Sequence, residues 1–176
     1  MKNLPDLQPD QLAYTFLQNG KTPTQSLTYQ QLAQQVSAIA SHLQTRVPPN
    51  STVLLLYPNN LEFLTAFLGC LSANVIAVPT PALESYQMKR AFPRILTIAI
   101  NAQPSLILTT SQLAEQFSQN SQNLPQLNSL EYLATDTFLP DQEIALNSNI
   151  SSQTIAYLQY TSGSTSAPKG VIISHR

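Results

Sequence analysis

The sequence predicts an α/β fold in which a mostly parallel sheet is flanked by helices. The apolar run 53–57 shows no alternation, which is typical of a strand covered on both faces, as in a parallel sheet. Further strands are expected at 75–78 and 105–108, with helical segments between them, and this alternation indicates the α/β class. At 176 residues the chain is long enough to form one domain with a hydrophobic core.

The first part of the chain is expected to hold two helices. Residues 11–18 are predicted to form a short helix that Asn19 and Gly20 end. A clearer helix begins at Thr28, whose hydroxyl can cap free N–H groups while Gln31 reaches back in a capping box, and such a Thr contributes about 1 kcal/mol. One face of this helix is apolar and is expected to be buried, through Leu32, Val36, Ile39, Ala40 and Leu43.

A β-α-β unit is predicted next. Pro58 ends the strand at 53–57, and Asn59 or Asn60 can cap a helix from Leu61 to about Ala73. Asn74 tolerates the left-handed conformation that often ends a helix, and 75–78 forms the following strand, so the crossover should be right-handed. The apolar stretch 61–78 contains polar residues and lies between two prolines, which favours a buried helix and strand over a membrane span.

The rest of the chain continues the pattern with less regularity. A Pro-broken helical region is expected at 84–102, a strand at 105–108 and a helix at 111–117. Residues 118–153 are predicted to be mostly loop, with a short strand around 132–134. We therefore divide the chain into an α/β subdomain, 1–154, and a strand-loop-strand unit, 155–176.

A loop rich in Ser and Thr carries the chemistry expected of this chain. It follows a predicted strand at 155–160 and precedes the β-branched run 171–173. A polyphosphate needs donors from several directions, and hydroxyls and backbone N–H groups can supply them here. Gly163 lets the main chain approach an anion, and Lys169 adds a positive charge suited to phosphate. The candidate phosphate-binding residues are Thr161, Ser162, Gly163, Ser164, Thr165, Ser166, Lys169 and Gly170.

Two other interpretations of this loop are weaker. A Walker P-loop would need glycine at Pro168 and Ser or Thr at Gly170, and it would open a helix where 171–173 predicts a strand. A surface hairpin with one incidental lysine is favoured by composition alone. The order of the residues favours phosphate binding, because the string at 158–169, LQYTSGSTSAPK, resembles the signature loop of the adenylate-forming superfamily. Ser166 stands where many members have glycine.

The resemblance extends along most of the chain and is weakest between 118 and 153. Thr28-Tyr29 with Leu32 looks like the early helix motif of the superfamily, and the segments 53–58, 67–71 and 77–79 are similar to fatty acyl-AMP ligases and long-chain acyl-CoA synthetases. The resemblance implies that the chain is the first part of the large N-terminal domain of such an enzyme, which joins a fatty acid to the α-phosphate of ATP, releases pyrophosphate, and passes the acyl group to a thiol.

The same resemblance implies partners and roles. The loop would hold the β- and γ-phosphates, with Lys169 stabilising the pyrophosphate leaving group, and Mg²⁺ would bridge phosphate oxygens. The acyl acceptor would be an acyl carrier protein or coenzyme A. The remainder of the ligase polypeptide, including the metal-binding glutamate and the C-terminal domain, has no counterpart in this sequence, so the chain alone is expected to be inactive. A fragment of an acyl-CoA synthetase and a noncatalytic truncated module are the alternatives.

Composition excludes other classes. A net charge of −1 and scattered basic residues argue against nucleic acid as a partner. Cys70, the single cysteine, lies in an apolar run and is expected to pack as a small hydrophobe, which fits a cytoplasmic location, as does the lack of an export signal.

His42 has no second ligand at metal-binding spacing, so a solvated or capping role is expected, and no metal site is predicted. His175 is assigned either a helix-entry or a substrate role, and Tyr57 and Tyr160 are expected to pack in the core.

Overall fold

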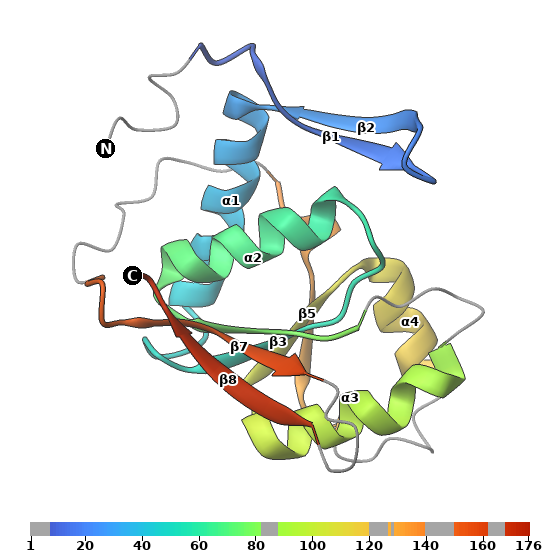
Figure 1. The fold of residues 1–176 in the computed structure, drawn as a ribbon, viewed down its shortest axis with the longest axis vertical. Coiled ribbons are helices and arrows are strands. Elements are labelled where there is room, and N and C mark those ends of the chain that lie inside the picture. The colour runs from blue at the N-terminus through green and yellow to red at the C-terminus, as the bar shows by residue number, and fades with distance from the viewer. Residues whose placement is uncertain (1–7, 82–87, 120–126, 128, 140–149, 162–167) are drawn as a thin grey trace.

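A six-stranded sheet forms the centre of the described part of the chain, with helices on both faces (Figure 1). The computed structural model describes residues 8–81, 88–119, 127, 129–139, 150–161 and 168–176. Along the sheet the strand order is β6-β5-β3-β4-β7-β8, with all neighbours parallel except the antiparallel pair β7-β8. The predicted α/β class and mostly parallel sheet are confirmed. The strands are β3 (Thr52–Leu55), β4 (Ile76–Pro79), β5 (Leu106–Thr109), β6 (Glu131–Ala134), β7 (Ile155–Thr161) and β8 (Lys169–Ser174).

The sheet separates two hydrophobic cores. Helices α1 (Tyr29–Gln44) and α2 (Leu61–Ala73) cover one face, and α3 (Met88–Ala102) and α4 (Ser111–Gln119) cover the other. Successive residues of β3 alternate between these cores, since Val53 and Leu55 face the first and Leu54 faces the second. All three are completely or almost completely buried, which explains why the run shows no polar alternation.

The predicted capping interactions are present at α1 and α2. The backbone N–H of Gln31 donates to Thr28 Oγ1 at 3.2 Å, and the Gln31 side chain accepts from the Thr28 N–H at 2.9 Å. Asn60 rather than Asn59 caps α2, because its side chain accepts from the N–H of Phe63 at 3.1 Å. Asn74 ends this helix in the left-handed region with φ of 58°.

The helix predicted at 11–18 is wrong. These residues form β1 (Leu12–Gln18), which pairs antiparallel with β2 (Thr22–Thr28) in a separate hairpin beside the first two helices (Figure 1). Asn19 and Gly20 both have positive φ, 53° and 68°. Asn-Gly is the preferred dipeptide of tight hairpin turns, so the signal taken as a helix end is the turn between two strands.

Helix α3 continues through Pro93 instead of breaking there. Proline removes a single backbone donor from the helix. The apolar face that follows is buried in the second core, through Ile95, Ile98 and Ala99, and this burial stabilises the helix. Residues 84–87 of the predicted region lie outside the described residues. In the part of the chain that the structure describes, no helix is both long and apolar enough to cross a membrane.

Candidate phosphate-binding hairpin

Strands β7 and β8 form at the two positions predicted for strands and carry the two ends of the candidate loop. β7 runs one residue further than expected and β8 begins two residues earlier, so Thr161 and Lys169 are paired in the antiparallel ladder instead of lying in the loop. Lys169 therefore starts a strand and not a helix, which excludes Walker P-loop geometry. The predicted site residues Ser162, Gly163, Ser164, Thr165 and Ser166 lie outside the described residues, and their role stays a prediction.

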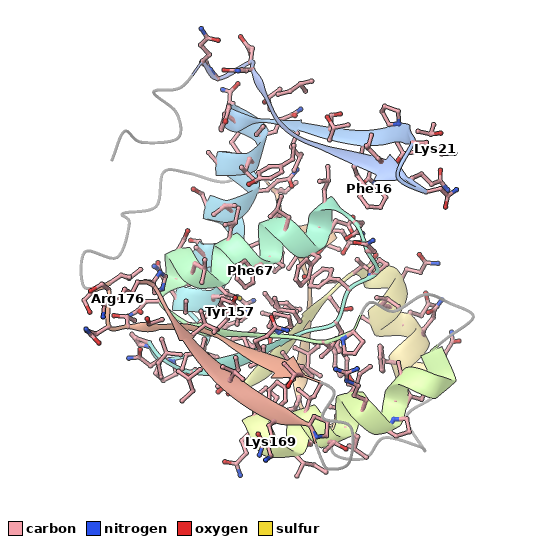
Figure 2. The ribbon with its side chains drawn as sticks, viewed as in Figure 1. Phe16, Lys21, Phe67, Tyr157, Lys169 and Arg176 are labelled. Atoms are coloured by element: carbon pink, nitrogen blue, oxygen red, sulfur yellow. The ribbon has the colours of Figure 1, made fainter. Side chains whose placement is uncertain are left out.

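Thr161 and Lys169 share one face of the hairpin. Side chains of directly paired residues in an antiparallel ladder lie on the same side of the sheet. Both residues are exposed, and Figure 2 shows Lys169 at the end of the hairpin. A hydroxyl and an ammonium are thus presented together at the mouth of the loop, a donor set suited to phosphate oxygens.

The adjacent pair of residues faces the opposite side, toward α3. Tyr160 is paired with Gly170, and its ring lies against the glycine backbone. The Tyr160 hydroxyl donates to Asn101 Oδ1 of α3 at 2.6 Å. Burial raises the pKa of Tyr160 above its ordinary value, so the phenol remains a protonated donor at neutral pH. Gly170, predicted as a phosphate-binding residue, contacts this ring, and its role toward phosphate stays a prediction.

Both tyrosines assigned to the core are buried, as predicted, and each also makes a hydrogen bond that the sequence did not indicate. Tyr57 is 2% exposed, and its hydroxyl lies 2.7 Å from Thr135 Oγ1. Tyr160 is 5% exposed. Their partners lie 78 and 59 residues away along the chain, and no periodic pattern connects such positions.

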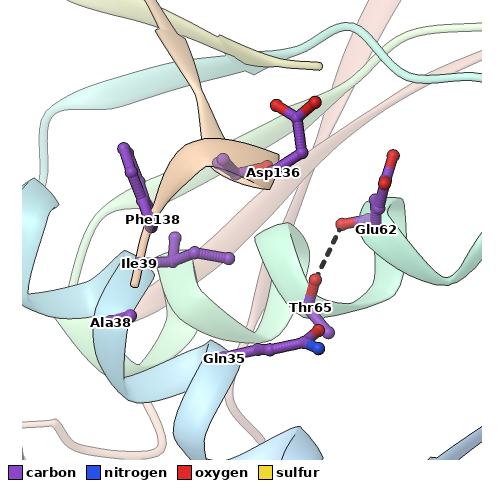
Figure 3. A pocket seen from close by; sticks show the side chains of 8 residues that line it. Gln35, Ala38, Ile39, Glu62, Thr65, Asp136 and Phe138 are labelled. Carbon is purple, nitrogen blue, oxygen red and sulfur yellow. Dashed lines mark hydrogen bonds between the residues drawn. The ribbon is translucent and has the colours of Figure 1, made fainter. Parts of the chain in front are cut away.

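A hollow of about 220 Å³ lies apart from the hairpin, between α1, α2 and the 3-10 helix Thr135–Thr137 (Figure 3). Two of its polar residues are engaged in local structure: Thr65 Oγ1 donates to the Glu62 carbonyl at 3.0 Å, and the Asp136 carboxylate accepts from Ser111 N and Oγ at 2.8 and 2.6 Å. Burial raises the pKa of Glu62 above its usual range, the Asn60 hydrogen bond opposes this shift, and the charge of Asp136 adds to it. The lining residues are Gln35, Ala38, Ile39, Glu62, Thr65, Thr135, Asp136 and Phe138.

The histidines and the cysteine have structural surroundings. The His42 ring stacks on Phe138 with centroids 3.9 Å apart, and its Nδ1 lies 3.1 Å from Arg46 Nη1, so it packs where a solvated or capping role was expected. The His175 N–H donates to the Thr154 carbonyl at 3.0 Å, which extends the β7-β8 pairing. Cys70 is fully buried, as predicted, and burial raises the pKa of its thiol. Among the described residues, no three His, Cys, Asp or Glu side chains gather at one point.

Comparison with known proteins gives consistent matches. The profile of the family described as AMP-binding enzyme matches residues 4–176. The chain is 44% identical over 168 residues to the medium-chain-fatty-acid–[acyl-carrier-protein] ligase JamA of Moorena producens, and the aligned region covers 93% of this chain and 28% of that protein. It is 35% identical over 183 residues to the long-chain-fatty-acid–AMP ligase FadD26 of Mycobacterium marinum, which covers 99% of this chain and 30% of that protein.

A solved structure has the same fold. The crystal structure of the fatty acyl-adenylate ligase from L. pneumophila, in complex with acyl adenylate and pyrophosphate, superposes with a TM-score of 0.76 at 32% identity and covers 97% of this chain and 29% of that one. The chain thus spans less than a third of the length of these relatives. Because the family profile matches nearly every residue, the chain belongs to the AMP-binding enzyme family.

Proposed function

We propose that this chain is the N-terminal portion of an ATP-dependent ligase that activates a fatty acid as its acyl-AMP. The observation that carries the proposal is the pairing of Thr161 with Lys169 at the open end of the hairpin. The two residues present a hydroxyl and an ammonium on one exposed face, and Lys169 has no carboxylate directly opposite it in the ladder. Such a pair suits the β- and γ-phosphates of ATP, which carry the charge that leaves as pyrophosphate.

The chemistry assigned to these residues is electrostatic. In acyl-AMP formation a carboxylate oxygen bonds to the α-phosphorus, and the bond from that phosphorus to the pyrophosphate oxygen breaks. The residues of the loop would hold and orient the leaving pyrophosphate while negative charge develops on it. The proposed phosphate-binding set is Thr161, Ser162, Gly163, Ser164, Thr165, Ser166, Lys169 and Gly170.

Mg²⁺ is proposed as a companion of ATP, but its ligands are not assigned to this chain. Mg²⁺ binds carboxylate and phosphate oxygens and keeps several waters. The described end of the hairpin supplies a hydroxyl and a cation, which fit phosphate and do not fit a metal ion. If Mg²⁺ is bound, it would reach the hairpin through the phosphates.

The proposed substrate and acceptor follow the names of the relatives. JamA is named as a ligase of medium-chain fatty acids and acyl carrier protein, and FadD26 as a ligase of long-chain fatty acids and AMP. We propose a fatty acid as substrate and a carrier-protein thiol as acceptor, with coenzyme A as the alternative. We propose that the remainder of the ligase polypeptide is the partner of both predicted units, the α/β subdomain 1–154 and the strand-loop-strand unit 155–176.

We also propose a cytoplasmic location. Its support is that Cys70 is a packed, buried thiol and not an exposed one available for a disulfide. A reducing compartment suits such a cysteine.

Titration with Mg·ATP tests the phosphate-binding role. The chain and its Lys169→Ala variant would be compared by isothermal titration calorimetry, with Lys21→Ala as the matched control. Lys21 is also an exposed lysine, but Figure 2 shows it at the other end of the molecule, in the β1-β2 turn. We expect Lys169→Ala to weaken binding about tenfold or more, because one charged contact contributes roughly 1.5–3 kcal/mol. Equal affinity of the two lysine variants would refute the proposal.

A further inference from the structure

The rung of the β7-β8 ladder next to the candidate loop contains an unusual pair, Tyr160 and Gly170. Tyr160 directly precedes Thr161, and Gly170 directly follows Lys169. A Cβ atom added to Gly170 would lie 2.9 Å from Cζ, 3.1 Å from Oη and 3.2 Å from Cε2 of the Tyr160 ring. Because Cβ atoms essentially never approach another heavy atom within 3.0 Å, any residue other than glycine would displace the ring. The tyrosine therefore spans both strands.

The hydroxyl of the same tyrosine ties the hairpin to α3. It donates to Asn101 Oδ1 at 2.6 Å, across 59 residues of sequence. Helix α3 is itself firmly packed, since Ile95 and Ile98 are completely buried in the core that also contains Tyr160. One side chain thus connects the two strands of the hairpin to helix α3.

We propose that Tyr160 is a positioning residue for the anion-binding end of the hairpin. This role rests on the proposed function of Thr161 and Lys169 and adds the element that orients them. A lysine ammonium is a point charge on a flexible stem, so its useful positions depend on where the backbone of Lys169 is held. The rung beside it is fixed by the Tyr160 ring on Gly170 and by the bond to Asn101. Fixing that rung before ATP binds reduces the entropy lost on binding.

Ordinary core packing is the competing explanation for Tyr160, and it makes different predictions. A tyrosine that only fills space can be replaced by phenylalanine without effect on the loop. A tyrosine that acts through Asn101 loses its effect when either side of the hydrogen bond is removed, and removal of both sides causes no further loss. Tyr157 offers the matched control, since it lies in the same strand but faces α2, where its ring packs against Phe67 with centroids 5.3 Å apart (Figure 2).

Amide hydrogen exchange of the chain tests the positioning role of Tyr160 without a ligand. We expect exchange at the Thr161 and Lys169 amides to become about three- to tenfold faster in Tyr160→Phe and in Asn101→Ala, the range expected from one lost hydrogen bond. The double variant should match either single variant, and Tyr157→Phe should match the wild type. Unchanged exchange in Tyr160→Phe, additive losses in the double variant, or an equal acceleration at the buried β3 amides would each overturn the proposal, the last because it indicates general destabilisation.

Mg·ATP titration of the same variants tests whether the positioning role of Tyr160 affects binding at the proposed phosphate site. Tyr160→Phe should weaken binding about three- to tenfold, and it should add a smaller loss in a Lys169→Ala background, since part of its effect acts through Lys169. If Lys169→Ala weakens binding and Tyr160→Phe does not, the positioning role is overturned and the proposed function stands. If Lys169→Ala binds as the wild type does, the proposed function fails, and this role fails with it.

Discussion

Replacement of Gly69 by alanine tests how tightly α1 and α2 pack at their contact. An added Cβ at Gly69 would lie 2.5 Å from Cγ2 and 2.8 Å from Cβ of Ile39. Helix propensity alone favours alanine over glycine by about 1 kcal/mol. Overpacking of a core costs about 1–3 kcal/mol, and the upper end applies because Ile39 is 2% exposed and β-branched, with one strongly preferred rotamer in a helix. The balance is a net destabilisation of about 2 kcal/mol.

Urea denaturation followed by circular dichroism measures this change. We expect Gly69→Ala to lower the midpoint at an unchanged m value. Ser72→Ala is the matched control in the same helix, because it changes helix propensity at a half-buried position. In an Ile39→Ala background, which removes Cγ2, the cost of Gly69→Ala should fall. A variant that is more stable than the wild type by about 1 kcal/mol would show that propensity dominates and that α1 moves aside at little cost.

Three further substitutions test separate parts of the chain. In the complete ligase proposed above, Lys169→Ala should reduce transition-state stabilisation by about 2–4 kcal/mol, and pyrophosphate-exchange rates within twofold of the wild type would contradict this. Thr28→Ala removes the hydroxyl that accepts from the Gln31 N–H in the capping box. The free energy of unfolding should therefore drop by about 1 kcal/mol, and an unchanged urea midpoint would argue against it. Because the folded state raises the pKa of Glu62 above 4.5, it binds that proton more tightly than the unfolded chain does, and the associated stability is lost as pH rises through the raised pKa. Glu62→Gln should flatten this part of the profile of melting temperature against pH, and parallel profiles for the two proteins would show the assignment to be wrong.

Local signals in the sequence predicted most of the secondary structure. The Thr28 capping box and the left-handed Asn74 both occur where predicted, because caps depend on residues within one helical turn. The strands of the sheet were also located to within a few residues. The predicted loop ends were displaced, since the backbone pairing that brings Lys169 into β8 depends on its register with β7.

The error at 11–18 shows the limit of such signals. Asn19 and Gly20 adopt positive φ, and this conformation occurs both at helix ends and in hairpin turns. The sequence therefore indicated a left-handed position correctly but not the structure that contains it. Pairing of β1 with β2 along the next segment decides between the two.

The sequence by itself determined the fold class and the family resemblance, because these depend on residue types and their spacing along the chain, and the phosphate-binding role of the candidate loop stays a prediction from the same spacing. Only the tertiary structure decided which side chains meet across long separations: Tyr160 with Asn101, Tyr57 with Thr135, and Gly69 with Ile39. The physical reason is that each of these contacts requires elements distant in sequence to be packed at a fixed distance, and short-range patterns of hydrophobicity and backbone preference contain no information about that distance.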